Sequence, residues 1–324
     1  MKKLVKLITP GIVILTVLVA VVFLSYCNRE KENVGDKTDR ETPGLVKQPV
    51  VSGQFYPAGR EQLSSMIRLY LSSASLIDLE GKLLGMMVPH AGYVYSGPVA
   101  AYVYRQLGTR SYRQIVVIAP SHYAPFPGVS ALDMESYRTP LGVIPIDREV
   151  IKKLIASRDW IRYEPRLYEK EHSLEVQLPF LQRTLSDFKL IPLVMGDSSP
   201  PLCRELAGVL LETLGTEGVL YLASSDMSHY FTYDRAKEMD ELTLEEMKSL
   251  DTEKLFQLQF EGKSQLCGLG PVMTIMELFQ KAGGSNVKVL HYANSGDVTG
   301  DKGRVVGYGA VAFLLPEGKI RKED

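Results

Sequence analysis

The sequence predicts an α/β fold, a single domain in which helices flank a mainly parallel or mixed central sheet. Apolar, strand-like runs alternate with segments of helical period through most of the chain. Such alternation is typical of domains in which helices cover both faces of a sheet. Hydrophobic residues make up 45% of the chain and charged residues 23%, which is ordinary for a globular protein with a core.

Seven apolar or β-branched runs are the expected strands. They span residues 83–89, 114–119, 142–146, 189–195, 219–223, 287–292 and 305–314. The expected helices span residues 97–107, 148–156, 172–185, 202–214, 234–250 and 271–282. Pro179 is expected to break or kink the third of these helices, because proline lacks an amide hydrogen. Pro271 stands in the first turn of the last helix, where proline is favoured.

The first 27 residues predict a membrane anchor or a lipoprotein signal peptide. Lys2, Lys3 and Lys6 precede an uncharged stretch over residues 7–26. A helix needs about 20 apolar residues to cross a bilayer, and a basic start before an apolar stretch also describes a signal peptide. The stretch ends at Cys27 in a sequence that resembles a lipobox. Because the positive end should stay in the cytoplasm, the body is expected to be extracytoplasmic.

The rest of the chain divides into three expected parts. Residues 28–48 are polar and charged and predict a flexible tether. Residues 49–316 hold the folded domain, and residues 317–324 form a charged tail. The formal net charge is -1, so no basic excess points to a nucleic-acid partner.

Four histidines lie in short polar segments, and three of them follow strand-like runs. His90 stands in VPHAGYVYSG, His122 in APSHY, His172 in EHSLEVQLPF and His229 in SSDMSHY. In open α/β sheets, ligands bind in the crevice beyond the carboxyl ends of the strands. The sequence therefore predicts a histidine-rich cleft that binds a metal. Taken singly, each histidine could instead be structural.

Asp226 and His229 are three residues apart, a spacing that places both on one face of a helical turn. The pair could ligate a metal, or Asp226 could orient the ring of His229. Alternatively, Asp226 or Ser225 could cap the start of a helix. His172 could act as an acid or a base, since imidazole titrates near neutral pH.

Cys267 lies in LCGLGP, a loop that leads into the N-terminus of an expected helix. That position lowers the pKa of a thiol and favours the thiolate, the form that binds metals. The alternative is a small buried residue. Imidazole and thiolate ligands suit iron, copper or zinc. Because no HExxH, Walker or GxSxG motif occurs, the metal hypothesis depends on the convergence of distant loops.

Ordered motifs in this chain resemble the Memo-like family, whose bacterial and archaeal members are called AmmeMemoRadiSam system protein B. The motifs are VPHAGYVYSGPVAA, APSHY, YRTPLG, EHSLEVQLPFLQ, IPLVMGD, SSDMSHY, CGLGP, and SGDVTGD followed by VVGYGA. The similarity extends over residues 51–315, almost the whole expected domain.

The resemblance implies the fold of class III extradiol ring-cleavage dioxygenases, in which a non-haem Fe(II) site opens a catechol ring with O₂. It places the metal ligands on His90, His122 and Cys267, with Asp226 and His229 in the same pocket, and His172 also matches a family motif. The cysteine replaces the carboxylate of a 2-His-1-carboxylate iron site. Ordinary dioxygenase activity therefore does not follow from the fold, and the expected cofactor is Fe(II) or Cu(I).

These observations favour a Memo-like metal-binding protein, an iron- or copper-dependent redox enzyme of unknown substrate. His229, His172 and Asp226 would take part in catalysis. The alternative is a non-enzymatic module that binds a peptide or small molecule in the same pocket. The family name implies a radical-SAM protein and an AMMECR1-like protein as partners, and the predicted anchor adds the membrane.

Overall fold

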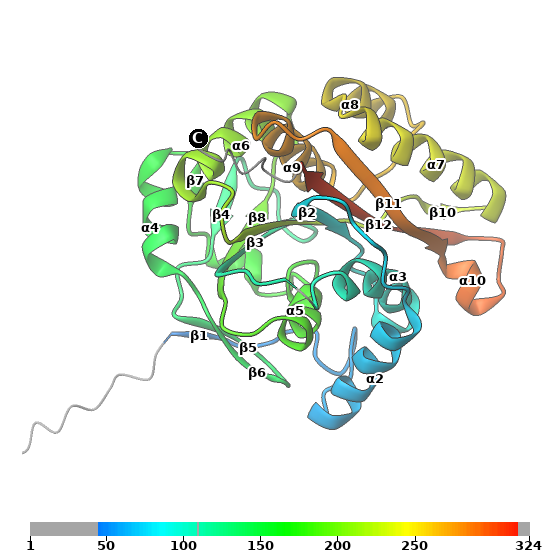
Figure 1. The fold of residues 1–324 in the computed structure, drawn as a ribbon, viewed down its shortest axis with the longest axis horizontal. Helices are drawn as coiled ribbons and strands as arrows, with labels where there is room; N and C mark the ends of the chain where they lie inside the picture. The colour runs from blue at the N-terminus through cyan, green and yellow to red at the C-terminus, as the bar shows by residue number, and fades with distance from the viewer. Residues whose placement is uncertain (1–44, 109, 317–324) are drawn as a thin grey trace, which may run out of the picture. The chain divides into compact units, whose positions relative to one another are not determined.

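Within residues 45–108 and 110–316, which the structure (a computed structural model) describes, nine strands form a mixed central sheet. The strand order is β10, β12, β2, β9, β3, β8, β4 and β7, with β11 paired to β12. Figure 1 shows α3 and α9 on opposite faces of this sheet, and both helices contact β2. The predicted α/β fold with a mixed sheet between helices is confirmed, and it agrees with the dioxygenase-like fold that the resemblance implies.

The strands of the central sheet are β2 (Lys82–Val88), β3 (Gln114–Pro120), β4 (Val129–Ala131), β7 (Ile161–Arg162), β8 (Lys189–Met195), β9 (Val219–Ser224), β10 (His229–Phe231), β11 (Asn286–Asn294) and β12 (Val305–Leu315). A smaller sheet contains β1 (Val46–Lys47), β5 (Ser136–Thr139) and β6 (Gly142–Pro145). The helices are α2 (Arg60–Ser73), α3 (Tyr93–Arg105), α4 (Arg148–Ser157), α5 (Leu178–Thr184), α6 (Pro200–Leu214), α7 (Tyr233–Ser249), α8 (Thr252–Phe260), α9 (Leu269–Lys281) and α10 (Ser295–Thr299). Two short 3₁₀ turns are η1 (Pro165–Tyr168) and η2 (Glu175–Gln177).

The middle of the sheet is buried on both faces. In β3 every residue after Gln114 is buried, and β9 is buried along its whole length. Parallel strands covered by helices on both sides are continuous apolar runs for this reason. Each fully buried valine, leucine or isoleucine side chain contributes about 1.5–3 kcal/mol to folding. The core therefore lies between this sheet and its helices.

The strands β2, β9, β3 and β8 lie side by side and parallel. Their carboxyl ends consequently lie side by side at the same end of the sheet. The segment with His90 follows β2, the segment with His122 follows β3, and the segment with Asp226 and His229 follows β9. The topology thus brings these distant segments together.

Pro179 does not break a helix. The segment expected as one helix over residues 172–185 forms η2 and then α5, and Pro179 stands at the first turn of α5. A proline is tolerated there because the first amides of a helix have no partner within the helix. The prediction for this segment is corrected accordingly.

The residues between Asp226 and His229 do not form a helical turn. Residues 225–228 have no regular structure, and His229 begins β10. The loop is held by its neighbours, since the amide of Met227 donates to the carbonyl of Gly307 at 2.8 Å. The helix-face and helix-cap interpretations of this pair are therefore wrong.

The predicted membrane anchor or signal peptide falls on residues 1–27, which lie outside the described residues. Among the described helices, none is long and apolar enough to cross a membrane. The longest of them, α7, has 17 residues and carries charged side chains throughout, whereas a spanning helix needs about 20 apolar residues. The described helices therefore do not support the predictions of a membrane-anchored protein, a signal peptide or lipoprotein, and an extracytoplasmic body, and these predictions are withdrawn. The membrane is not retained as a partner.

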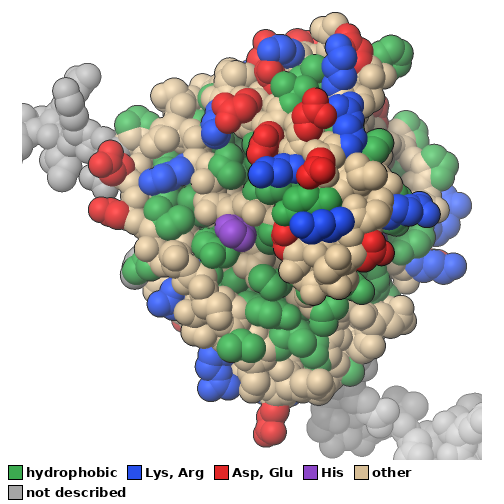
Figure 2. Space-filling view, turned by 90° about the vertical axis from the view of Figure 1, so that its right-hand side faces the viewer, with side chains coloured by type: hydrophobic (Ala, Val, Ile, Leu, Met, Phe, Trp, Pro, Cys, Tyr) green, Lys and Arg blue, Asp and Glu red, His purple; other side chains and the backbone are tan. Residues whose placement is uncertain are grey.

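The surface in Figure 2 carries acidic and basic side chains close to one another in its upper part, while hydrophobic side chains gather lower down. The interspersed charges match the formal net charge of -1. This face therefore has no extended patch of a single charge.

Candidate metal centre

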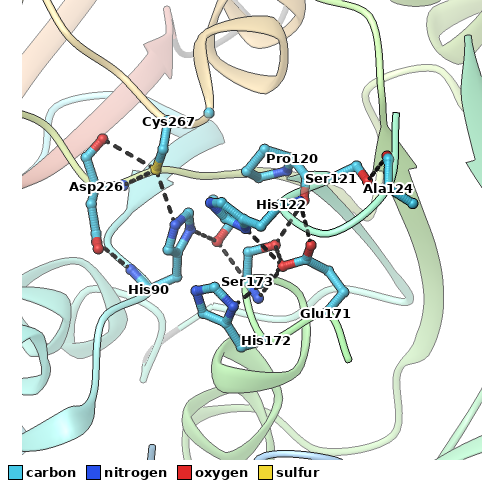
Figure 3. Close-up of polar contacts among 12 residues, drawn as sticks. His90, Pro120, Ser121, His122, Ala124, Glu171, His172, Ser173, Asp226 and Cys267 are labelled. Atoms are coloured by element: carbon cyan, nitrogen blue, oxygen red, sulfur yellow. Dashed lines mark hydrogen bonds and ion pairs between the residues drawn. The ribbon is translucent and has the colours of Figure 1, made fainter. Parts of the chain in front are cut away.

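The four histidines from the polar segments line one cleft with a volume of about 640 Å³. His90, His122, His172 and His229 share it with Asp226. The ring centroids of His90 and His122 are 5.1 Å apart, those of His90 and His172 5.4 Å, and those of His122 and His172 4.7 Å. Three imidazoles therefore face one another around a small volume, as Figure 3 shows.

One donor set combines two histidines of the cleft with a thiol next to them, and its three residues come from separate loops. His90, His122 and Cys267 each offer a ligand atom, and these atoms all lie within 4.8 Å of one another. Cys267 belongs to the loop between α8 and α9, so its thiol reaches the strand ends from a helical layer. Such a set of two imidazoles and one thiol matches the ligand chemistry of iron, copper or zinc.

The hydrogen-bond network determines which nitrogen of His90 is available. The hydroxyl of Ser224 donates to the carbonyl of Ser173 at 2.6 Å, so it can only accept from His90 Nδ1, which lies 2.9 Å away. The proton of the neutral ring is then on Nδ1, and Nε2 carries the lone pair. Nε2 lies 3.0 Å from the Sγ atom of Cys267. Burial lowers the pKa of His90 well below its ordinary value, and the nearby His122 lowers it further, so this ring is neutral.

His122 is oriented by a buried carboxylate, that of Glu171. Oε1 of Glu171 lies 2.9 Å from His122 Nδ1, and Oε2 accepts from the backbone amide of His122 at 2.7 Å. Burial opposes ionisation of Glu171, but its interactions with His122 and the amide of Ser173 outweigh burial and lower the pKa of Glu171 to about 2. An ionised Glu171 holds the proton of His122 on Nδ1. Nε2 of His122 is then free to bind a ligand.

Cys267 is a thiol and not the thiolate that its position suggested. Burial raises the pKa of Cys267, and the neighbouring Asp226 carboxyl raises it further. These two effects exceed the opposing influence of the hydrogen bonds that Asp226, Ser225 and Gly268 make with the sulfur. The amide of Asp226 donates to Sγ at 3.1 Å, and the thiol can donate to the lone pair of His90 Nε2. The prediction of a lowered thiol pKa is therefore wrong.

Gly268 allows Cys267 to approach the sheet. A Cβ atom on Gly268 would lie 2.2 Å from the carbonyl oxygen of Ser224, which is closer than any real contact. The amide of Gly268 instead donates to the hydroxyl of Ser225 at 3.0 Å. The glycine in the LCGLGP motif is thus required by the close packing of this loop on the end of β9.

A family model described as Memo-like protein matches residues 47–312, nearly all of the domain that contains this centre. The chain belongs to the Memo-like family. Its relatives include proteins named MEMO1 family protein in three archaea. The relative in Nitrosopumilus maritimus is 31% identical over 83% of this chain and 100% of its own length. The relative in Ignicoccus hospitalis is 39% identical over 84% of this chain and 100% of its own length. The relative in Methanosarcina mazei is 37% identical over 82% of this chain and 98% of its own length.

In this Memo-like protein, Asp226 stabilises the loop that carries His90. Its Oδ1 atom accepts from the amide of His90 at 2.7 Å and from the amide of Ala91 at 3.3 Å. Asp226 is 5% exposed, and burial raises its pKa. The carboxyl therefore fixes the backbone of the loop after β2, which positions His90 beside Cys267.

His172 has a buried ring nitrogen that makes no hydrogen bond with the described residues. This atom is Nδ1, and Oε1 of Glu171 lies 3.5 Å away from it. Burial lowers the pKa of His172 to about 4, and His90 contributes to the decrease. The ring is therefore neutral at physiological pH. The ring of Phe55 covers it, with centroids 4.5 Å apart.

Sequence reasoning missed three supporting residues of the Memo-like centre. Glu171 orients His122, Ser224 orients His90, and Gln177 donates from Nε2 to Ser224 at 2.8 Å. The only signal for Glu171 was its position beside His172. Ser224 is the last residue of the buried strand β9, and Gln177 lies in the short 3₁₀ turn η2. Nothing in the sequence around these two polar residues indicates a role at the metal centre.

Proposed function

We propose that this protein is a metal-dependent redox enzyme, whose metal ion is held by His90, His122 and Cys267. The observation that carries the proposal is the arrangement of the two imidazoles. Ser224 and Glu171 each occupy an Nδ1 atom, which leaves both Nε2 lone pairs for a shared ligand beside Sγ. A hydrogen-bonding partner on the other nitrogen is typical of metal-binding histidines.

The residues fit an iron or copper ion better than a hard cation. The set combines neutral imidazole with a sulfur donor, whereas magnesium and calcium prefer oxygen ligands. Iron or copper in such a site can exchange electrons with O₂ or with an organic substrate. The neutral Cys267 thiol would give up its proton on binding, since the thiolate is the form that ligates.

The remaining cleft residues supply proton transfer and positioning. His172 is neutral and lies beside the ionised Glu171, which favours a proton on its Nδ1 and leaves Nε2 to accept a proton from a substrate. His229 lines the same cleft and is the second residue for proton transfer. Asp226, predicted as catalytic, acts through His90 by fixing its backbone.

Oxygen consumption tests the redox part of this proposal. The protein is loaded anaerobically with Fe(II) or Cu(I), mixed with a series of catechols, and exposed to air-saturated buffer. We expect uptake of O₂ that depends on both metal and substrate, and a lower rate without loss of metal in His172→Gln and His229→Gln. A protein that binds metal but consumes no O₂ with any catechol would contradict this redox activity.

The alternative function, a non-enzymatic module that binds a peptide or small molecule, uses the same cleft and needs no metal. Metal content distinguishes the two, because a binding module retains its ligand when His122 and Cys267 are replaced. The predicted radical-SAM and AMMECR1-like partners rest on the family name and stay predictions.

A further inference from the structure

The cleft continues from the histidines to a second group of side chains at its mouth. Tyr95, Tyr230, Arg304 and Tyr308 line this part. They come from α3, β10, the loop after α10, and β12. In Figure 1, β10 and β12 lie at the right-hand side of the sheet, and α10 lies next to them. A molecule that fills the cleft would therefore contact both the histidines and this outer group.

Arg304 is an exposed cation without an acidic partner. Within residues 45–108 and 110–316, no carboxylate forms an ion pair with its guanidinium. The guanidinium lies over the ring of Tyr230, 5.1 Å from the ring centroid. Asp301 also lines the cleft, but its Oδ1 atom accepts from the amide of Gly303 at 2.9 Å within the same loop. The positive charge of Arg304 is thus available to an anion in the cleft.

Tyr230, whose ring lies under this guanidinium, has a strained backbone conformation. Its φ angle is +66°, a left-handed conformation that costs about 1–2 kcal/mol for a residue with a side chain. Next to it, the amide of His229 donates to Oε1 of Gln265 at 2.7 Å, and β10 pairs with β12 with an irregular register. The surrounding contacts therefore fix a conformation that places an aromatic ring under Arg304.

Tyr308 supplies a neutral hydrogen-bond donor to the cleft. The side chain is 2% exposed and lines the cleft, and no described residue makes a hydrogen bond with its hydroxyl. Burial raises its pKa, and the nearby groups of Asp226, Tyr95 and Tyr230 act in the same direction. The hydroxyl therefore keeps its proton and can donate a hydrogen bond.

We infer that Arg304 and Tyr308 bind the anionic group of a small aromatic substrate whose other end lies at the histidines. A guanidinium presents paired N–H donors that match a carboxylate or a phosphate. The rings of Phe55, Tyr95 and Tyr230 provide flat apolar walls for an aromatic ring. The volume of about 640 Å³ falls within the roughly 300–1,000 Å³ of small-molecule sites. The inference names a substrate class for the function proposed above, although anion binding by Arg304 does not itself require the metal.

Binding of matched probes tests this inference. Phenylacetate, its neutral isostere phenylacetamide, and phenyl phosphate are titrated into the full-length protein and followed by ligand-observed NMR. The variants are Arg304→Gln and the matched control Lys302→Gln, because Lys302 is in the same loop but lies over Tyr233, 4.6 Å from the centroid of that ring. Each titration is run on protein as purified and again after chelation, since a carboxylate could also bind a metal directly. Metal content is measured in every sample.

We expect an anionic probe to bind more tightly than phenylacetamide and to lose about tenfold or more in affinity in Arg304→Gln, because a hydrogen bond between two charged groups is lost. A preference for phenylacetate or for phenyl phosphate identifies the anion. The same loss in Lys302→Gln, equal binding of acid and amide, or no binding of any probe to the wild type would overturn the inference. A protein that shows the Arg304 effect but contains no metal would support this inference and contradict the metal proposal.

Discussion

The carboxylate of Glu171 binds His122 twice, through Nδ1 of the ring at 2.9 Å and through the backbone amide at 2.7 Å. The same carboxylate accepts from the hydroxyl of Ser173 at 2.7 Å. Glu171 therefore fixes the position of His122, its ring orientation and its tautomer together. These contacts give His122, although it lies in a loop and is partly exposed, the fixed orientation that a metal ligand requires.

Replacing Glu171 by glutamine should weaken metal binding without unfolding the protein. Glutamine keeps the shape of the side chain but cannot accept the same set of hydrogen bonds or favour the proton on Nδ1. Loss of such a supporting contact typically costs about 10–100-fold in metal affinity. Metal titration under anaerobic conditions measures it, with Glu169→Gln as the control because Glu169 is exposed. Equal metal affinities for Glu171→Gln and the control would contradict this role.

Asp240 should make the protein less stable as pH rises from about 4 to 6. Burial raises its pKa to about 6 from 3.8, although Ser228 and Tyr292 donate hydrogen bonds to it. Below pH 4 both the folded and unfolded states hold the proton. Between the two values only the folded state does, so the free energy of unfolding falls as pH rises, by at most about 3 kcal/mol.

The Asp240→Asn variant isolates this contribution, because asparagine can accept from the amide of Ser228 and donate to the two hydroxyls. Urea unfolding at pH 4.0, 5.0, 6.0 and 7.0 is compared for wild type and variant. We expect the variant to gain stability relative to the wild type as pH increases, with the whole gain present by about pH 7. A difference that does not change with pH would disprove the assignment.

Glu175 should contribute strongly to stability. This fully buried carboxylate accepts from the amides of Val50 and Val51 at 2.7 and 3.0 Å and from the hydroxyls of Tyr56 and Tyr137 at 2.7 and 3.2 Å. Glu175→Ala leaves these donors without an acceptor, a defect of about 3 kcal/mol or more. Chemical denaturation measures the loss.

The control for Glu175 is Glu212→Ala, an exposed position in α6, which should change the free energy of unfolding by less than about 0.5 kcal/mol. Limited proteolysis adds a local measurement, since the residues around Val50 should become accessible in Glu175→Ala. Similar stabilities for the two variants would show that Glu175 is not a structural anchor.

The meeting of the histidines at one edge follows from features that the sequence shows. His90 and His122 each come directly after an apolar run, and parallel strands bring such ends together. The position of Cys267 in the centre followed only from the family resemblance, because its loop comes from the helical layer and no strand leads into it. Its pKa could not be predicted, since burial is the main cause of the increase and Asp226, which raises the pKa further, lies 41 residues away in the chain.

Glu171 could not be assigned from the sequence for a similar reason. Its partner His122 is 49 residues away, and the contact depends on how the irregular segment around η1 and η2 packs under the strand ends. The loop over residues 225–228 was expected to be helical because a spacing of three suits a helix. Contacts with β12 and with Asp240 on α7 hold it in an irregular conformation instead.

Metal content is the most direct test of the central claim, that His90, His122 and Cys267 hold a metal ion. Elemental analysis is made on full-length protein purified anaerobically, for the wild type, His122→Ala and Cys267→Ala. The matched controls are His291→Ala and Cys203→Ala, which replace the same residue types outside the cleft. We expect about one equivalent of iron or copper in the wild type and both controls and little in the two site variants. A wild type that contains no metal, and takes up neither Fe(II) nor Cu(I) on titration, would contradict the claim.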